Sequence, residues 1–287
     1  MNNDVFNFNR FGRYLVTDIR NAVSKYGITL LVMASFSITI YLIVGMFSAV
    51  TGNGWISTGL VLRVILFGLA TLIVLISSPS KIYGFITDKK EGTSFLMVPV
   101  STLEKTLSML IVSCIVVPFS FFAIYLSLDQ ILCLMDPGCG DSVIYALNES
   151  RSSILDGLSQ LSQEFEIYPD VLSSGFWVYL DDIAQTILTF LLGALLFKTA
   201  KPAKTIGCIM ILSIVMSMIM VPVISFGAVE KFKVAVENDM TPQELFDSFP
   251  VLSWMFRHAL LVDTITDTVV NLALSVGIYF RVKKIKH

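Results

Sequence analysis

The stretch that decides the fold is GITLLVMASFSITIYLIVGMFSAV, residues 27–50, which contains no charged side chain. At a rise of about 1.5 Å per residue, a helix of this length crosses the roughly 30 Å hydrocarbon core of a bilayer. The stretch is too long for the apolar core of a signal peptide and lacks a convincing small-residue cleavage site. We therefore expect it to be retained as a membrane anchor.

Five further apolar stretches are also long enough to span a bilayer, and they lie near residues 55–77, 106–128, 176–197, 205–228 and 259–280. Of the 287 residues, 55% are hydrophobic and 15% are charged, against about 25% charged residues in ordinary soluble domains. This composition predicts an all-α, polytopic membrane protein with six transmembrane helices. It leaves no room for a large soluble catalytic domain, and with only two histidines we expect no metal site.

Basic residues gather on one side of this arrangement. The segments before the first span, after the second, after the fourth and after the sixth hold 15 of the 20 Lys and Arg residues. The loop 129–175 instead holds eight acidic residues and one basic residue. Because positively charged flanks resist translocation, we expect both termini to lie in the cytoplasm, which requires an even number of spans.

The segment 1–26 has the pattern of an amphipathic helix. Its apolar residues recur every three or four positions, and they are Phe8, Phe11, Leu15, Ile19 and Ala22. The opposite side carries Arg10, Arg13, Thr17, Arg20 and Ser24. We predict an elbow helix in the headgroup layer ahead of a six-span domain at 27–287. The alternative is a helix packed on the protein's own cytoplasmic surface.

The cytoplasmic connection 79–105 is the longest one on that side. Ser101 and Glu104 have the spacing of a capping box, so the third helix is predicted to begin at Ser101. An apolar patch at 95–98 has a charged rim, as a protein docking surface would, although a loop packed under its own helices would look similar. The candidate contact residues are Asp88, Lys89, Lys90, Glu91, Phe95, Leu96 and Met97.

The outer loops 129–175 and 229–258 are predicted to form a small helical cap. A helical stripe lies at 152–166, a capping box at 241–244, and an apolar run at 249–256 is expected to dip into the outer leaflet and return. Cys133 and Cys139 could form a disulfide in an oxidising compartment or remain as two free thiols.

Ionisable residues inside the spans need partners, because a charge in hydrocarbon costs at least ~2.5 kcal/mol. Arg63 and Asp267 lie at matching depth, so we predict that Arg63 pairs with Asp267 or with Asp263. Such a pair could fix helix register or line a transport path. The full predicted polar seam is Arg63, Asp181, Asp182, Gln185, Asp263, Asp267 and Asn271.

One motif suggests a family. The run DKKEGTSFLMVPVSTLEK at 88–105 is similar to the acidic, Gly-Thr, leucine-rich, Pro-Val-Ser segment between the second and third spans of type-2 ABC exporter permeases. The layout of the chain also resembles these membrane subunits, specifically small permeases of Bacteroides-like bacteria. The resemblance implies a dimer in the bacterial inner membrane, formed with itself or with a related permease. It also implies a separate cytosolic ATPase that binds ATP and Mg and docks on the 79–105 connection.

No catalytic motif, phosphate-binding loop or paired-cysteine zinc spacing is present in the sequence, so we expect no enzyme activity and no cofactor in this chain. The expected partners are the ATPase, a second permease and the lipid bilayer, with no nucleic acid. The apolar spans suggest a lipid-like or amphipathic peptide cargo. Alternatives are a non-transporting membrane scaffold or immunity-type protein, and an ion-coupled secondary carrier that uses Asp263 and Asp267.

Overall fold

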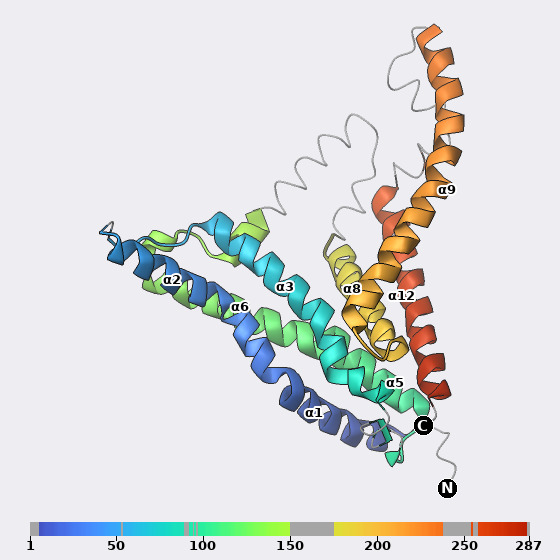
Figure 1. The fold of residues 1–287 in the computed structure, drawn as a ribbon, viewed down its shortest axis with the longest axis horizontal. Helices are drawn as coiled ribbons and strands as arrows, with labels where there is room; N and C mark the ends of the chain where they lie inside the picture. Colours follow the sequence, from blue (N-terminus) through green and yellow to red (C-terminus); the bar gives the residue numbers. More distant parts are fainter. Residues whose placement is uncertain are drawn as a thin grey trace.

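The computed structural model describes residues 6–52, 54–88, 92–93, 95, 97–149, 175–237, 254 and 258–285. All regular secondary structure in these residues is helical (Figure 1). The elements are α1 (Phe8–Ala34), α2 (Phe36–Val50), α3 (Leu60–Tyr83), η1 (Gly84–Thr87), α5 (Thr102–Ile111), η2 (Val112–Val116), α6 (Val117–Met135), η3 (Pro137–Cys139), α8 (Gly175–Leu196), α9 (Lys201–Glu237) and α12 (Ala259–Lys284).

Several of these helices have the length and composition of membrane spans. Five stretches of the described chain are long and apolar enough to cross a bilayer, and they are Phe8–Val50, Leu60–Thr87, Thr102–Met135, Lys201–Ile219 and Leu261–Lys284. The prediction of an all-helical, multi-pass membrane protein is therefore confirmed by the length and composition of the described helices.

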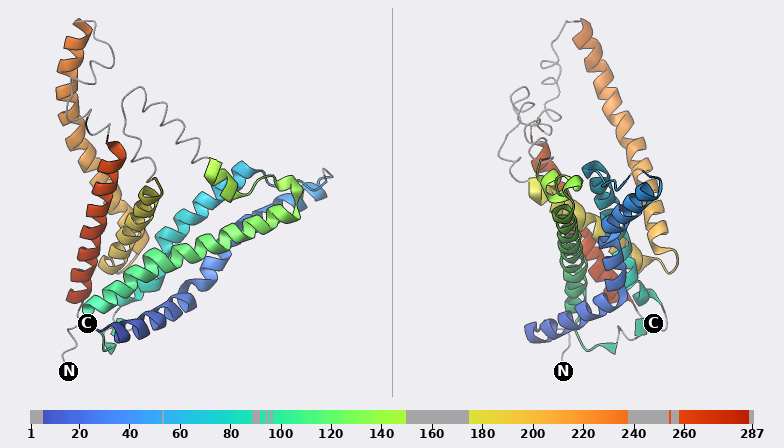
Figure 2. Two further views of the ribbon diagram at one scale, coloured as in Figure 1. Left: turned by 180° about the vertical axis from the view of Figure 1, so that it is seen from behind. Right: turned by 90° about the vertical axis from the view of Figure 1, so that its left-hand side faces the viewer.

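The helices form two groups that meet at one end and diverge toward the other (Figures 1 and 2). One group contains α1, α2, α3, α5 and α6, and the other contains α8, α9 and α12. Helix α8 joins them because it packs against both α3 and α12. We call the end where α1 begins and α12 ends the basal end, and the end that holds η3 the distal end. The start of α1 and the last turn of α12 thus lie at the same end of the molecule.

The core runs along the seam between the two groups. Aromatic residues from three helices of the first group, Tyr26, Tyr83 and Phe121, are at most 1% exposed. They belong to one apolar cluster with Leu191 of α8 and Ile278 of α12. Burial of each large apolar side chain stabilises the fold by about 1.5–3 kcal/mol.

The amphipathic segment at the amino terminus belongs to a longer helix than predicted. Helix α1 continues to Ala34, and a turn at Ser35 separates it from α2. Its first turns cross the basal ends of the other helices (Figure 2). Phe11 and Ala22 are buried in the protein. The predicted apolar stripe therefore covers the bundle itself, as the alternative interpretation required, whereas Phe8 is 77% exposed.

The third predicted span is interrupted at Val112–Val116, where five residues form a π-helical turn. Pro118 follows in the first turn of α6. Proline has no backbone N–H and its ring clashes with the preceding turn of a regular α-helix, so the wider π turn accommodates it. The break in the regular α-helix thus lies directly before Pro118.

Helices α8 and α9 approach each other closely beside the short turn that connects them. Gly193 of α8 faces Thr205 of α9, and a Cβ atom added to Gly193 would overlap the Thr205 hydroxyl. Ala200 in the turn has a positive φ of 50°, which keeps the connection tight. Only glycine allows this separation between the two backbones.

We predict that Gly193→Ala lowers the free energy of unfolding by about 1–3 kcal/mol, because the added methyl group overpacks the contact with Thr205. Gly207 of α9 has nothing within 4 Å of an added Cβ, so Gly207→Ala is the matched control and should be neutral or stabilising. Thermal unfolding of the detergent-purified protein measures both. Equal melting temperatures for the two variants would contradict the close approach.

Candidate functional site

The Glu104 carboxylate connects the amino-terminal helix to the 79–105 connection at the basal end. It accepts hydrogen bonds from Arg10 Nη2 at 2.7 Å, from the Asn7 backbone at 2.8 Å and from the Ser101 backbone at 2.9 Å. The Ser101 hydroxyl in turn accepts from the Glu104 backbone N–H, which completes a capping box. The predicted start of the third helix at Ser101 is confirmed. The Glu104 side chain is fully buried, so its charge depends on the Arg10 partner.

The connection itself is partly folded beneath the bundle. Phe95 is only 6% exposed and packs edge-on against Phe85, and its carbonyl accepts a hydrogen bond from Lys105 Nζ at 2.8 Å. The prediction that Phe95 belongs to an exposed docking patch is therefore wrong. Its ring was predicted to face the cytosol because the sequence does not show the apolar floor that Phe85 supplies.

The other predicted contact residues divide into two sets. Met97 is 82% exposed and Asp88 is exposed as well, so both are available to a partner. The remaining candidates lie outside the described residues, and they are Lys89, Lys90, Glu91 and Leu96. The part of the connection with a described position thus presents two large apolar side chains outward, Met97 and, at 49% exposure, Leu103.

The second group of helices is also attached to the basal end. Lys201, the first residue of α9, donates through Nζ to the Gly84 carbonyl of η1. Arg281 Nε of α12 donates to the Leu195 carbonyl of α8 at 3.0 Å. The connection between α3 and α5 therefore contacts α1 on one side and the α8–α9 turn on the other.

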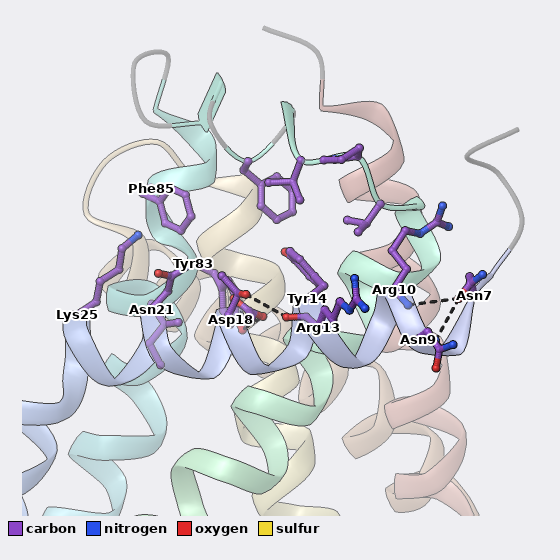
Figure 3. A pocket seen from close by; sticks show the side chains of 16 residues that line it. Asn7, Asn9, Arg10, Arg13, Tyr14, Asp18, Asn21, Lys25, Tyr83 and Phe85 are labelled. Atoms are coloured by element: carbon purple, nitrogen blue, oxygen red, sulfur yellow. Dashed lines mark hydrogen bonds between the residues drawn. The ribbon is translucent and has the colours of Figure 1, made fainter. Parts of the chain in front are cut away.

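A cavity of about 680 Å³ separates α1 from the connection. Figure 3 shows that Tyr14 and Lys25 of α1 point toward the connection, with Lys25 next to Phe85. The Lys25 ammonium lies 3.2 Å from the centroid of the Phe85 ring. Tyr14, Tyr83 and Val98 contribute further to the lining. The cavity therefore combines aromatic surface with charged groups.

Asp18 is the buried acid of this cavity and is 8% exposed. Its Oδ2 accepts hydrogen bonds from Ser108 Oγ at 2.6 Å and from Tyr83 Oη at 2.8 Å. Asp18 is not among the site residues predicted from the sequence. The available signal was its place four residues before Ala22 and seven after Phe11, on the otherwise apolar stripe of α1.

At the distal end, Arg63 is fully buried one turn into α3 and pairs with Asp129 of α6 at 3.0 Å. Its Nη2 also donates to the carbonyls of Cys139 and Asp141. The predicted pairing with Asp267 or Asp263 is wrong. Asp129 had been assigned to the loop that follows the third span, whereas α6 continues to Met135 and carries the carboxylate to the depth of Arg63.

The other members of the predicted polar seam do meet between α8 and α12. Asp181 accepts a hydrogen bond from Thr268 through its carboxylate and one from Asn271 through its carbonyl, both at 3.2 Å. The Asp267 carboxyl interacts with Gln185 and lies within electrostatic range of the other seam carboxylates, Asp181, Asp182 and Asp263. The seam thus forms without Arg63.

Asp136 organises the distal turn. Its carboxylate accepts hydrogen bonds from Ser57 and Tyr41 at 2.7 Å and from the Gly138 backbone at 2.8 Å, which lowers its pKa below the ordinary value. Cys133 and Cys139 flank this turn as free thiols. Of the two alternatives left open by the sequence, the structure contains the free thiols.

The remaining predictions for the distal side fall largely on residues without a described position. The helical stripe at 152–166 and the capping box at 241–244 lie outside the described residues, and so does the apolar run at 249–256 apart from Trp254. No group of three or more metal-ligating side chains is found in the part of the chain that the structure describes. No known protein family, curated protein or solved structure matches the chain.

We predict that Asp129→Ala destabilises the protein by about 3–5 kcal/mol, because it leaves the buried Arg63 charge without its partner. Asp267→Ala is the control and should change stability much less. Replacing both members of the pair, in Arg63→Met with Asp129→Leu, should cost less than Asp129→Ala alone. Thermal unfolding compares the four proteins, and equal losses for the Asp129 and Asp267 variants would contradict this pairing.

The two distal cysteines should differ in reactivity. Burial raises the pKa of the Cys139 thiol to about 11, so only about one part in a thousand is thiolate at pH 8. Cys139 is 2% exposed whereas Cys133 is half-buried. We expect iodoacetamide to alkylate Cys133 first, as read by peptide mass spectrometry. Faster modification of Cys139, or a disulfide between the two in the purified protein, would contradict the structure.

Proposed function

We propose that the chain is the permease subunit of an ATP-driven exporter of the type-2 ABC class. A separate cytosolic ATPase binds ATP and Mg and docks on the 79–105 connection at the basal end. The permease itself hydrolyses nothing and pairs with a second copy or a related permease in the bacterial inner membrane. Its proposed cargo is lipid-like or an amphipathic peptide, because the spans are apolar along most of their length.

The observation that carries this proposal is the way the connection is held. Glu104 and Arg10 attach its end to α1, Lys105 and Phe95 fold it onto α5, and Lys201 attaches its start to α9. A force applied to the connection is therefore transmitted to helices of both groups. Met97 remains exposed on the same segment, where a partner can contact it. A surface that receives work from another protein needs both properties.

The topology of the proposal is six spans with both termini in the cytoplasm. Helix α8 has 22 residues and serves as the sixth span in addition to the five apolar stretches. An even number of crossings agrees with the positions of α1 and α12, which begin and end at the basal end (Figure 1). The basic residues favour the cytoplasm for that end, and α1 then lies at the inner membrane surface as an elbow helix.

The proposed pairing of permeases is supported by α9. The described apolar side chains from Ile209 to Ile219 are exposed around the whole helix, including Ile211, Leu212 and Met218 at 63–71%. Helices that are apolar all round need apolar surroundings on every side. Lipid supplies part of these surroundings, and in the proposed dimer a second permease supplies the rest.

We predict that Met97→Asp weakens docking of the ATPase, because it places a charge in the apolar centre of the contact. A loss of 2 kcal/mol or more at such a centre weakens binding by roughly 30-fold. The assay is the rate of ATP hydrolysis by the complex purified from the native host with its ATPase.

Met135→Asp is the control, because Met135 is 80% exposed at the distal end and should leave ATP hydrolysis unchanged. Purification of the wild-type chain without any nucleotide-binding partner would contradict the proposed function. Equal hydrolysis rates for the Met97 variant and the wild type would contradict the proposed docking segment.

A further inference from the structure

We propose that the π turn at Val112–Val116 is a hinge, on which the distal part of the first helix group swings relative to the second group. The two groups meet at the basal end and diverge toward the distal end (Figures 1 and 2). A swing about this turn therefore widens or narrows the separation between α6 and α12 at the distal end. The inference concerns the helices alone and does not rest on the proposed ATPase or on transport.

The position of the π turn is that of a joint between the two groups. On its basal side, α5 packs against α12 of the second group, and on its distal side, α6 packs against α2 and α3 of the first group. Both halves also contact α1. The turn itself packs against α1 and α8, so it lies where the groups meet. The apolar stretch Thr102–Met135 thus changes its partners at the turn.

Polar contacts fasten this stretch on each side of the turn but not at the turn. The basal contacts join α5 to α1, and they are Arg10–Glu104 at 2.7 Å and Asp18–Ser108 at 2.6 Å. The distal contacts join α6 to α3 and α2, and they are Arg63–Asp129 at 3.0 Å and Tyr41–Asp136 at 2.7 Å. Between them, within 109–124, no hydrogen bond to another helix is found among the described residues. Apolar packing alone holds the level of the turn.

The neighbouring helices of the first group are interrupted as well. The chain turns at Ser35 between α1 and α2, so α2 can follow α6 while α1 stays with α5. Helix α3 contains Pro79 near its basal end, where the ring removes a backbone hydrogen bond. Prolines and π turns are the usual sites of sharp kinks in helices. Each of the three segments that run from the basal to the distal end of this group therefore has a place to bend.

Buried hydroxyl groups without a partner lie at two of these breaks. The Oγ atom of Ser113 is within the π turn, and those of Ser78 and Ser80 flank Pro79. All three are buried and have no hydrogen-bond partner among the described residues. Elsewhere in these helices, as at Thr106, the hydroxyl donates to the carbonyl four residues earlier. Because an unpartnered buried hydroxyl is unfavourable, these groups lower the stability of this arrangement relative to one in which they bond.

The backbone of the turn shows which hydrogen bond changes in a swing. The Val117 N–H donates to the Val112 carbonyl, five residues earlier. In a regular α-helix it would donate to the Ser113 carbonyl instead. Pro118 has no N–H, so it cannot reinforce either pattern from the next position. The Val117 N–H thus has two carbonyls within one turn as acceptors, and a change between them alters the direction of α6 relative to α5.

The test is a distance measurement by pulsed electron paramagnetic resonance on the full chain in lipid nanodiscs. Spin labels attached to non-canonical amino acids at Met135 of α6 and Ile265 of α12, which are 80% and 56% exposed, leave the four cysteines in place. Helix α6 has 19 residues, so Met135 lies about 28 Å from the turn. A swing of about 20° moves it by up to roughly 10 Å. We expect two distances, or one distribution at least twice as broad as that of a control pair.

The control pair is Val50 and Met135. Both side chains are exposed at the distal end, and the bond between Tyr41 and Asp136 joins their helices, so this pair should give one narrow distance. Deletion of Ile115, which is 61% exposed, removes the extra residue of the π turn and restores a regular helix. The deletion should reduce the pair formed by Met135 and Ile265 to a single distance.

A pair of substitutions tests the role of the unpartnered hydroxyl. Ser113→Ala removes it, so the populations should shift at least twofold away from the distance seen in the Ile115 deletion. Ser120→Ala is the matched control, because the Ser120 hydroxyl already donates to the Val116 carbonyl at 2.6 Å, and it should leave the populations unchanged.

A wild-type distance between Met135 and Ile265 as narrow as that of the control pair overturns the proposal and makes the π turn a fixed bend before Pro118. This holds also when the deletion fails to fold. An equally broad distribution for the control pair places the motion elsewhere and overturns the hinge, as does a deletion variant that keeps both distances. Equal effects of Ser113→Ala and Ser120→Ala overturn the role of the hydroxyl. No ATPase is present, so this result and that of the docking experiment are independent.

Discussion

The buried Glu104 carboxylate is the interaction on which the basal end depends. It compensates the Arg10 charge, accepts a hydrogen bond from the Asn7 backbone N–H at the start of α1 and caps the start of α5, so one side chain joins the first turns of two helices. Because the side chain is fully buried, the loss of any one partner leaves charge or donors unsatisfied. The position of α1, and with it one wall of the cavity, follows from this contact.

The distal end is also held together by a buried ion pair. Arg63 and Asp129 are both fully buried, and the arginine also takes up two carbonyls of the turn after α6. Both ends thus contain a buried ion pair, but the two pairs hold different segments of the chain. The Arg63 pair fastens a turn onto the ends of α3 and α6, whereas the Glu104 network fastens a whole helix beside a segment with an exposed Met97.

Much of this could be predicted from the sequence. Apolar length predicted membrane-crossing helices, and the Ser101 and Glu104 spacing predicted the start of α5. The errors concern tertiary partners. The predicted end of the third span at residue 128 is seven residues short of the observed end at Met135, so Asp129 was assigned to a loop and Arg63 was matched by depth alone. Phe95 and Asp18 show the same limit, because burial of an aromatic ring or an acid depends on neighbours distant in the sequence.

We propose that the 79–105 connection receives work from an ATPase and passes it to both groups of helices. Hydrogen–deuterium exchange of the purified complex, with and without Mg-ATP, tests this most directly. We expect the partner to protect the connection from exchange, and nucleotide to change exchange in the connection together with the first turns of α1 and α9. Protection confined to the distal loops, or a connection whose exchange is the same with and without the partner, would contradict it.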